Sequence, residues 1–359
     1  MEAWNPTRTR VHSLAIELTA FCNQHCDYCY NAWRADGGIS VGTPEIDKLL
    51  ARIDRVLEAV SLEHVTITGG EPLASKDLFR VLDHLRRRHV KAQMISNGAL
   101  VTPEIAQKLA KHRLMAVLVT LNGPDAALHD GLVGGEHFDD TIAGIRLLRE
   151  ARVPVEGSIV ITRRNAERVG ETMRLFLSLG VRKIALSRFS PAGYSTALAR
   201  ELMPARQDVQ RALEQAVAIA RVDPALILFS TMPIPPCAIE REKFPEVDFH
   251  DCPIGTSQQE FALGPHGEIR HCALHRDAIE GASDVLDPRV DVAKIFASGD
   301  PHRYRAVLPR YCEGCEHASS CAGGCGAAAR WVKGDHDVDP FVAWEKDAEP
   351  PKRRLQLVG

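Results

Sequence analysis

The placement of ten cysteines constrains this chain more than any other feature, because they gather near its two ends. Three lie close together at Cys22, Cys26 and Cys29, and none follows until Cys237. Stable disulfides are rare in a reducing compartment, where cysteines in such numbers are more typical of metal ligation. The spacing therefore predicts two metal-binding regions. The remaining cysteines are Cys252, Cys272, Cys312, Cys315, Cys321 and Cys325.

The composition is that of an ordinary globular protein with room for one large and one smaller domain: 359 residues, 45% hydrophobic and 25% charged. The formal net charge of -3 argues against non-specific electrostatic binding of nucleic acid or acidic lipid. No stretch approaches the roughly 18 apolar residues of a membrane span, and the first residues lack the apolar segment of a secretory signal. We therefore expect a cytoplasmic protein with no nucleic-acid or membrane partner.

Short β-rich runs alternate with amphipathic helical runs over residues 13–232, which is typical of a parallel sheet wrapped by helices. Six strand–helix repeats predict an α/β fold, a partial (β/α)6 TIM-like barrel whose site lies among loops at the carboxyl ends of the strands. The expected strands span residues 13–18, 64–68, 92–95, 115–120, 155–161 and 183–186, and the expected helices span residues 43–60, 76–88, 103–112, 139–151 and 167–179.

The repeating pattern stops at residues 233–236, which read Pro-Ile-Pro-Pro. The chain beyond this stretch is rich in loops and cysteines, as in a region that metal holds together more than an apolar core does. We therefore expect four segments, a lead-in over residues 1–12, the barrel over 13–232, a cysteine-rich region over 233–335 and a tail over 336–359.

The three-cysteine loop comes directly after the first expected strand and reads Cys22-x3-Cys26-x2-Cys29. Three thiolates at this spacing can hold three irons of a four-iron cubane and leave the fourth iron without a protein ligand. An open coordination position distinguishes reactive metal sites from closed structural ones. A zinc knuckle with His25 as a fourth ligand is the alternative. Tyr28, between the last two cysteines, suits either packing on a bound adenine or filling the barrel mouth.

With Tyr28 as its aromatic residue, this loop resembles the Cys-x3-Cys-x-aromatic-Cys signature of the radical S-adenosylmethionine superfamily. The segment Gly69-Gly70-Glu71-Pro72 comes after the second expected strand and is similar to the motif that receives the methionine amino group in that superfamily. Glycines allow close backbone approach, and a carboxylate can accept hydrogen bonds from an ammonium group. The resemblance implies a catalytic 4Fe-4S cluster on the three cysteines, with S-adenosyl-L-methionine bound at its open iron.

Further expected cofactor contacts come from the next strand ends. Ser96-Asn97-Gly98 and Thr120-Leu121-Asn122 come after the third and fourth expected strands and are similar to segments that line the cofactor pocket in relatives. Many relatives have Asp where this chain has Asn122, which argues against a proton-accepting role there. Ser158 and Arg188 occupy the fifth and sixth expected strands, where the family often contacts the ribose and carboxylate of the cofactor. Arg188 suits a salt-bridged barrel arginine equally well.

The resemblance also implies the chemistry. A reduced cluster passes one electron to the sulfonium of S-adenosylmethionine, and the 5′-deoxyadenosyl radical that forms removes a hydrogen atom from a substrate C–H bond. The cofactor performs the difficult step, while the protein positions the reactants and excludes water and oxygen. An electron donor such as flavodoxin or ferredoxin is an expected partner.

The C-terminal cysteines are similar in spacing to the SPASM extension found on a subset of these enzymes, which holds two auxiliary 4Fe-4S clusters. The matching elements are Gly267-x4-Cys272 and the Cys-x2-Cys-x5-Cys-x3-Cys run over residues 312–325. Carried over, the pattern assigns a nearer cluster and a farther one. The nearer cluster would be held by Cys237, Cys252, Cys272 and Cys325, and the farther one by Cys312, Cys315 and Cys321.

The farther cluster lacks its fourth cysteine, because no cysteine lies beyond Cys325. Either one iron is left open or a non-cysteine ligand completes the cluster, and the nearest candidates are Asp335, His336, Asp337 and Asp339. A zinc ribbon is the alternative for the whole C-terminal group, since four closely spaced cysteines suffice for it.

The SPASM resemblance favours oxidative modification of a peptide or protein side chain, by analogy with relatives that are mostly maturases. An auxiliary cluster could collect the electron that a substrate radical loses. The first expected strand begins near residue 13, which leaves no room for the N-terminal peptide-docking module of many maturases, so a separate peptide-binding protein is a further expected partner. The alternatives are radical modification of a sugar, nucleoside or tetrapyrrole, and a non-catalytic iron–sulfur protein.

Overall fold

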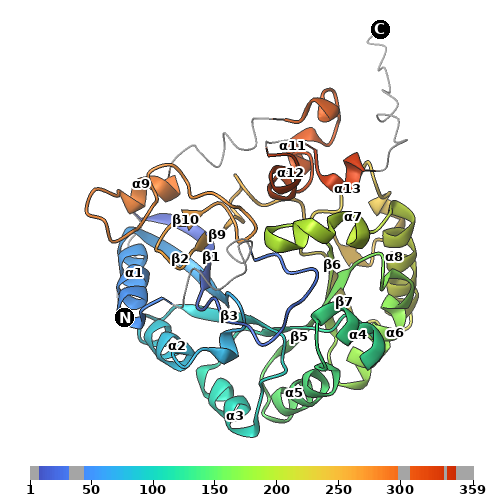
Figure 1. The fold of residues 1–359 in the computed structure, drawn as a ribbon, viewed down its shortest axis with the longest axis horizontal. Helices are drawn as coiled ribbons and strands as arrows, with labels where there is room; N and C mark the ends of the chain where they lie inside the picture. The colour runs from blue at the N-terminus through green and yellow to red at the C-terminus, as the bar shows by residue number, and fades with distance from the viewer. Residues whose placement is uncertain (1–7, 32–43, 298–307, 335–337, 345–359) are drawn as a thin grey trace.

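A curved sheet of ten strands organises the molecule, and helices pack around its outside (Figure 1). The computed structural model describes residues 8–31, 44–297, 308–334 and 338–344. The strand order is β10-β9-β1-β2-β3-β4-β5-β6-β7-β8, and every neighbouring pair is parallel except β9 with β10. The strands are β1 (Thr9–Glu17), β2 (Val60–Thr68), β3 (Lys91–Ser96), β4 (Val117–Thr120), β5 (Val155–Ile161), β6 (Lys183–Arg188), β7 (Ile227–Phe229), β8 (Val247–Asp248), β9 (Glu260–Leu263) and β10 (Ile269–Arg270).

The predicted α/β partial barrel is confirmed, since all six expected strands form and lie in sequence order in the sheet as β1 to β6. The expected helices form as α1 (Ile46–Ala59), α2 (Leu78–Arg87), α3 (Pro103–His112), α5 (Phe138–Glu150) and α6 (Val169–Ser178). Sequence reasoning did not identify α4 (Ala126–Val133), α7 (Ala199–Leu202) and α8 (Arg206–Ala220). None of the described helices is long and apolar enough to cross a membrane.

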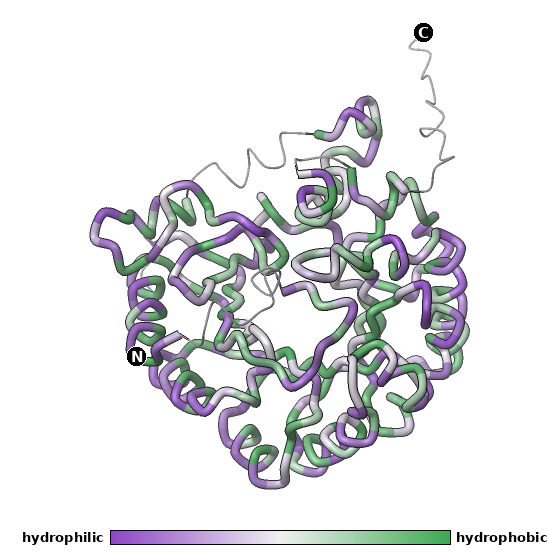
Figure 2. Tube along the Cα trace, in the orientation of Figure 1, coloured by the Kyte–Doolittle hydropathy of each residue, from purple (hydrophilic) through white to green (hydrophobic). Residues whose placement is uncertain are grey.

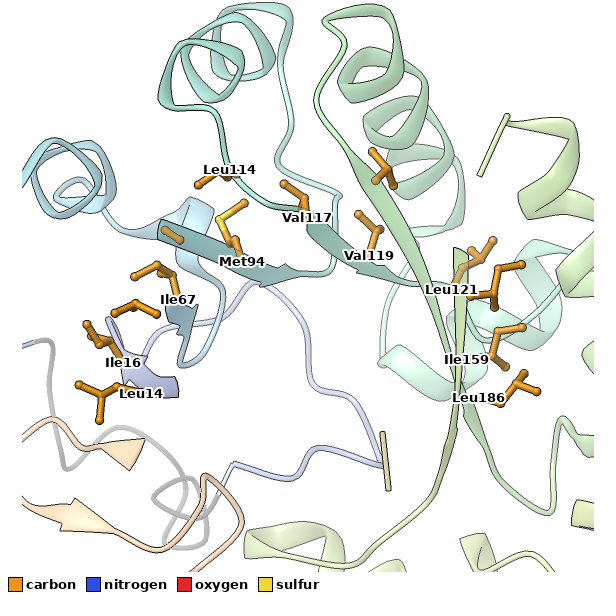
Figure 3. Packing of buried hydrophobic residues seen from close by; sticks show 14 of the residues in the cluster. Leu14, Ile16, Ile67, Met94, Leu114, Val117, Val119, Leu121, Ile159 and Leu186 are labelled. Atoms are coloured by element: carbon orange, nitrogen blue, oxygen red, sulfur yellow. The ribbon is translucent and has the colours of Figure 1, made fainter. Parts of the chain in front are cut away.

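The main core fills the space between the sheet and its helices. In α2 the buried residues Leu78, Val81, Leu82 and Leu85 recur at helical spacing and form one apolar stripe. Hydrophobic and hydrophilic residues alternate along the outer helices in Figure 2, as such stripes require. Figure 3 shows side chains from successive strands, among them Ile16, Ile67, Val119 and Ile159, within one cluster. This packing fixes the loops at the carboxyl ends of the strands.

The sheet continues beyond the boundary expected at residue 232. Strand β9 pairs in parallel with β1, so that Ser13 lies beside Glu260. Phe261, Leu263 and the helix α9 (Val292–Ala297) join the same hydrophobic core as the barrel. The first part of the cysteine-rich region is therefore held by strand pairing and apolar burial, contrary to the expectation of a mainly metal-held region.

The last part of the chain has less apolar packing than the first. It contains the short helices α11 (Ala318–Cys321), α12 (Gly326–Lys333) and α13 (Pro340–Ala343). Cys312, Val338 and Val342 form one small buried cluster, and Cys325, Ala327 and Ala328 form another. Apolar burial on this scale contributes little, because each small side chain removes only a modest area from water.

Candidate active site

The three-cysteine loop is fixed by the segment directly after β2. The Gly70 amide donates to the carbonyl of Thr19 at 2.6 Å, and the Glu71 amide donates to the carbonyl of Phe21 at 2.9 Å. A Cβ atom on Gly70 would lie 2.1 Å from the oxygen of Phe21. Gly69 has a φ of +126°, which non-glycine residues rarely adopt. The two glycines thus allow the backbones of the two loops to meet just before Cys22.

Glu71 joins the loops after β2 and β3. Its buried carboxylate accepts from the Ser96 hydroxyl at 2.8 Å and from the backbone amides of Asn97 at 2.8 Å and Leu73 at 3.0 Å. Burial raises the pKa of Glu71 to about 6, although the three hydrogen bonds act in the opposite direction. The Asn97 side-chain amide donates to the side-chain amide oxygen of Asn23 at 2.8 Å. The loops after β1, β2 and β3 therefore form one hydrogen-bonded unit.

A cavity of about 370 Å³ opens inside the curved sheet, and four sequence-predicted cofactor residues line it: Tyr28, Thr120, Ser158 and Arg188. Tyr28 belongs to the three-cysteine loop, so that loop borders the cavity. Burial, followed by the neighbouring Cys26 thiol, raises the pKa of Tyr28 well above its usual value. The phenol therefore stays neutral and offers an aromatic face to the cavity.

Asn122, another residue expected to contact the cofactor, is not among the residues that line this cavity. Its side chain is fully buried, and its amide oxygen accepts from the backbone amide of Val160 at 2.8 Å. Asn165 donates to the backbone carbonyl of Asn122 at 3.0 Å. Asn122 therefore joins the end of β4 to β5 and the turn after it.

Arg188 is a fully buried ion-pair partner, as one of the two sequence interpretations has it. Its guanidinium donates to the Asp339 carboxylate at 2.6 Å and lies 4.7 Å from the centre of the Phe341 ring. Asp339 also accepts from the backbone amides of Cys325 at 2.8 Å and Phe341 at 2.9 Å. The pair connects β6 to the residues that begin α13.

Asp339, one of the non-cysteine ligands that the sequence suggested for the farther cluster, thus takes part in this ion pair. Each of its two carboxylate oxygens already accepts at least one hydrogen bond in a site without exposure to solvent. The other three candidates, Asp335, His336 and Asp337, lie outside the described residues.

Sequence reasoning missed a buried acid in the cavity wall. Glu260 of β9 accepts from the hydroxyls of Ser13 at 3.1 Å and Thr66 at 2.5 Å, and burial raises its pKa. Gln93 donates in turn to Thr66 at 3.0 Å. Ser190, another lining residue, has a buried hydroxyl for which the described residues supply no partner. No motif marks Glu260, because it meets Ser13 and Thr66 only once β9 has paired with β1.

The seven C-terminal cysteines fall into two sets. One set, which we call the outer cysteine set, lines a small second cavity beside Tyr311 and Val338. The other, which we call the inner cysteine set, lines the main cavity. The sequence pattern assigned Cys237 to the nearer cluster, but the structure places it with the farther cysteines. The outer set is Cys237, Cys312, Cys315 and Cys321, and the inner set is Cys252, Cys272 and Cys325.

Both sets provide the donors that iron–sulfur clusters use. Burial, followed by the charges of Asp251 and Cys237, raises the pKa of Cys321 to about 12. Burial also raises the pKa of Cys325, with Asp339 as the next cause. Such thiols are neutral until a metal binds and displaces their protons. Within the described residues, no three His, Cys, Asp or Glu side chains converge as a single-ion site requires. A cubane instead binds each thiolate at a separate iron.

Comparison with known proteins agrees with this geometry. Residues 16–176 match the family described as the Radical SAM superfamily. An AdoMet-dependent heme synthase of Methanosarcina barkeri is 32% identical over 46% of this chain and 47% of its own length. The mycofactocin maturase MftC of Mycobacterium tuberculosis is 30% identical over 55% of this chain and 50% of its own length. The chain thus spans about half the length of these two relatives. A PqqA peptide cyclase of Rhodopseudomonas palustris is 26% identical over 92% of this chain and 86% of its own length.

Solved structures show the same fold. SuiB of Streptococcus suis, bound to its precursor peptide SuiA, superposes with a TM-score of 0.73 at 16% identity and covers 92% of this chain and 75% of its own. The protein anSMEcpe with bound AdoMet superposes with a TM-score of 0.69 at 18% identity, and the match covers 92% of this chain and 90% of anSMEcpe.

Proposed function

We propose that this chain is a radical SAM enzyme with a SPASM-type C-terminal region, and that it cleaves S-adenosylmethionine reductively and modifies a peptide or protein side chain. The match of residues 16–176 to the Radical SAM superfamily and the similarity to peptide-modifying maturases support this proposal. One observation supports this most strongly. The three-cysteine loop borders a large internal cavity, and a second group of cysteines lines the same cavity. A substrate in that cavity would lie within reach of both metal sites.

The catalytic cluster and S-adenosylmethionine, when bound, supply the electron and the 5′-deoxyadenosyl radical that removes a hydrogen atom from the substrate. Cys22, Cys26 and Cys29 would hold this cluster. The contact of Gly70 with Thr19 keeps their loop in place. Glu71 fixes Ser96 and Asn97, and its charge favours an ammonium group nearby. Tyr28, Thr120 and Ser158 present an aromatic ring and two hydroxyls to the cavity, groups that suit an adenine and a ribose.

The C-terminal cysteines would hold two auxiliary 4Fe-4S clusters. The lining of the main cavity is largely apolar, with Met94, Leu118, Phe229 and Leu274 among its residues. Such a wall excludes water from a radical. A cluster at the edge of this cavity would accept the electron released when a substrate radical is oxidised. A flavodoxin or ferredoxin would supply the electrons at the start, and a separate protein would present the peptide.

A small-molecule substrate is the second candidate, and similarity to a heme synthase favours a tetrapyrrole among such substrates. A tetrapyrrole also suits an apolar cavity. The two candidates differ in their genetic neighbourhood, since a peptide reaction needs an encoded peptide and a tetrapyrrole reaction does not. They also differ in whether a peptide or a tetrapyrrole changes mass in the reaction.

The test is anaerobic incubation of the reconstituted protein with dithionite and S-adenosylmethionine. We expect 5′-deoxyadenosine to form, and about twelve irons per chain if three four-iron clusters are present. Replacing Cys22, Cys26 and Cys29 by Ala should abolish 5′-deoxyadenosine formation and leave about eight irons. Formation that persists in the triple variant would refute the proposed cleavage, and one zinc with about four irons would refute the auxiliary clusters.

A further inference from the structure

Among the described residues, two acids line the main cavity, and only one of them has a cation beside it. Glu156 of β5 accepts from the Lys183 ammonium group at 2.8 Å. Glu260 of β9 pairs with no Lys or Arg side chain of the described residues. His12 is the only basic group among them that acts on Glu260, and His12 itself lies 3.1 Å from the Glu63 carboxylate. The described residues therefore leave the charge of Glu260 unbalanced.

The hydrogen bonds of Glu260 use only one of its two carboxylate oxygens. The hydroxyls of Ser13 at 3.1 Å and Thr66 at 2.5 Å both donate to Oε2, and no described residue donates to Oε1. The side chain also keeps part of its surface accessible. Ser190 lines the same cavity, and its buried hydroxyl has no partner among the described residues. Both groups can therefore bind polar atoms of a molecule that enters the cavity.

Neighbouring strands hold the Glu260 carboxylate in one orientation. Ser13 lies directly beside Glu260 in the register of β1 with β9. Gln93 of β3 donates to the Thr66 hydroxyl at 3.0 Å, which directs the hydrogen of that hydroxyl toward Glu260. The adjacent strands β9, β1, β2 and β3 thus all contribute to one hydrogen-bonded group (Figure 1). A group that is positioned before its ligand arrives loses less entropy on binding.

We propose that Glu260 binds a positively charged group of the substrate, an ammonium or a guanidinium, at the inner wall of the main cavity. This inference rests on one part of the proposed function, namely that the main cavity holds the substrate. Both cations carry several N–H donors, and their hydrogen bonds to a carboxylate are among the strongest in proteins. The bound cation also balances the charge that the described residues leave unbalanced.

The position of Glu260 along the barrel separates it from Glu71, which would attract the ammonium group of S-adenosylmethionine. Glu71 lies beyond the end of β2, whereas Thr66, the partner of Glu260, lies within that strand. Thr66 is two residues before the last residue of β2, which corresponds to roughly 7 Å along a strand. Glu260 therefore lies deeper in the barrel than Glu71, and its cation is a different one from the methionine ammonium group.

The rest of the cavity suits an apolar chain that ends in this cation. Met94 and Leu118 are among its apolar lining residues, and Tyr28 of the three-cysteine loop borders the same space. The methylene groups of a lysine or arginine side chain pack on such a surface while the charged end reaches a polar partner. A basic side chain of a peptide therefore fits this cavity better than a substrate that presents carboxylates, as a tetrapyrrole does, because Glu260 would repel them.

The experiment is isothermal titration of the full, reconstituted and unreduced chain with hexylammonium, in the absence of S-adenosylmethionine. The neutral 1-hexanol and the anionic hexanoate are the comparison probes. The buffer is mildly alkaline, because burial raises the pKa of Glu260 and the ionised carboxylate is the form that binds a cation. We expect hexylammonium to bind most tightly and hexanoate least.

Glu260→Gln should weaken the binding of hexylammonium about 10- to 100-fold, since a hydrogen bond to a charged group is lost, and should leave the binding of hexanol unchanged. The variant keeps an oxygen that can accept from Ser13 and Thr66. Glu156→Gln is the matched control, because Glu156 lines the same cavity but already has Lys183 as its cation. Its affinity for hexylammonium should equal that of the wild-type protein.

Unchanged affinity for hexylammonium in Glu260→Gln, or an equal loss in Glu156→Gln, would overturn the inference. So would a wild-type protein that binds hexylammonium no better than hexanol. Should Glu260→Gln fail to fold, a crystal structure of the wild-type protein with hexylammonium decides the question. A nitrogen at hydrogen-bond distance from Glu260 supports the inference, and a nitrogen elsewhere contradicts it. Because the titration involves neither reduction nor S-adenosylmethionine, its failure leaves the proposed cleavage untouched.

Discussion

The three-cysteine loop and the C-terminal cysteines reach metal-binding geometry by different routes. Cys22, Cys26 and Cys29 lie within one loop, which the Gly69–Gly70 segment fixes through backbone hydrogen bonds. The seven C-terminal cysteines are spread over residues 237–325, and tertiary packing sorts them into two sets. The local motif therefore brings its three cysteines together within one loop, which contacts from other strand ends then fix, whereas the dispersed set depends on chain reversals and ion pairs even to bring its cysteines together. Perturbing each region separately tests this difference.

Removal of iron should have the largest effect on the resistance of the protein to proteolysis, and it should affect the C-terminal region more than the barrel. Among the described residues of 308–344, Phe341 and Trp344 reach the main core, and other buried apolar residues form two small clusters. In zinc-finger peptides, structural metal binding contributes on the order of 10 kcal/mol to folding, and we expect iron to act in the same direction here. Anaerobic chelation should therefore expose this segment to limited proteolysis, while the helices α1 to α8 stay resistant. Mass spectrometry locates the cuts, and cleavage within the barrel before any in the C-terminal segment would contradict the account.

Arg188→Met should be the most destabilising single substitution, because it leaves the Asp339 carboxylate buried and unpaired. Breaking such a pair costs about 3–5 kcal/mol. Denaturant unfolding of the anaerobic protein measures the loss. The double variant with Asp339→Asn is the control, and it should recover part of the stability. A double variant as unstable as the sum of the single variants would show that the two side chains are not coupled.

Gly70→Ala should disturb the three-cysteine loop, because its Cβ would lie 2.1 Å from the Phe21 oxygen. Overpacking of this kind costs about 1–3 kcal/mol. We expect the variant to lose the N-terminal iron while the C-terminal iron remains, as measured by iron content and EPR. Gly131→Ala is the matched control, since a Cβ there meets nothing within 4 Å. Equal iron loss in both variants would remove the special role of Gly70.

The smallest expected effect is a pH dependence of the affinity for S-adenosylmethionine, caused by titration of the Glu71 carboxyl group. With a pKa of about 6 its carboxylate is ionised above pH 6 and protonated below. An ammonium group favours the ionised form. Affinity for S-adenosylmethionine should therefore fall about tenfold from pH 7 to pH 5. Isothermal titration on the unreduced protein measures it, and Glu71→Gln should bind weakly with no such slope. An equal slope in the variant would assign the titration to another group.

The sequence predicted the strands and helices of the barrel well, because they are local patterns. Strand β5 and helix α3 have the expected limits, since periodicity and the Thr102 cap define them. The placement of Cys237 and the presence of Glu260 in the cavity wall could not be predicted. Both depend on contacts between residues far apart in the chain, namely the pairing of β9 with β1 and the reversal at Ala322–Gly324.

The most direct test asks whether S-adenosylmethionine binds an iron of the N-terminal cluster. Electron–nuclear double resonance on the reduced protein, with the methionine amino group labelled with ¹⁵N, measures this contact. The account predicts a ¹⁵N hyperfine coupling that is lost when Cys22, Cys26 and Cys29 are replaced by Ala. A fully loaded, reduced protein that binds the labelled compound without any such coupling would contradict it.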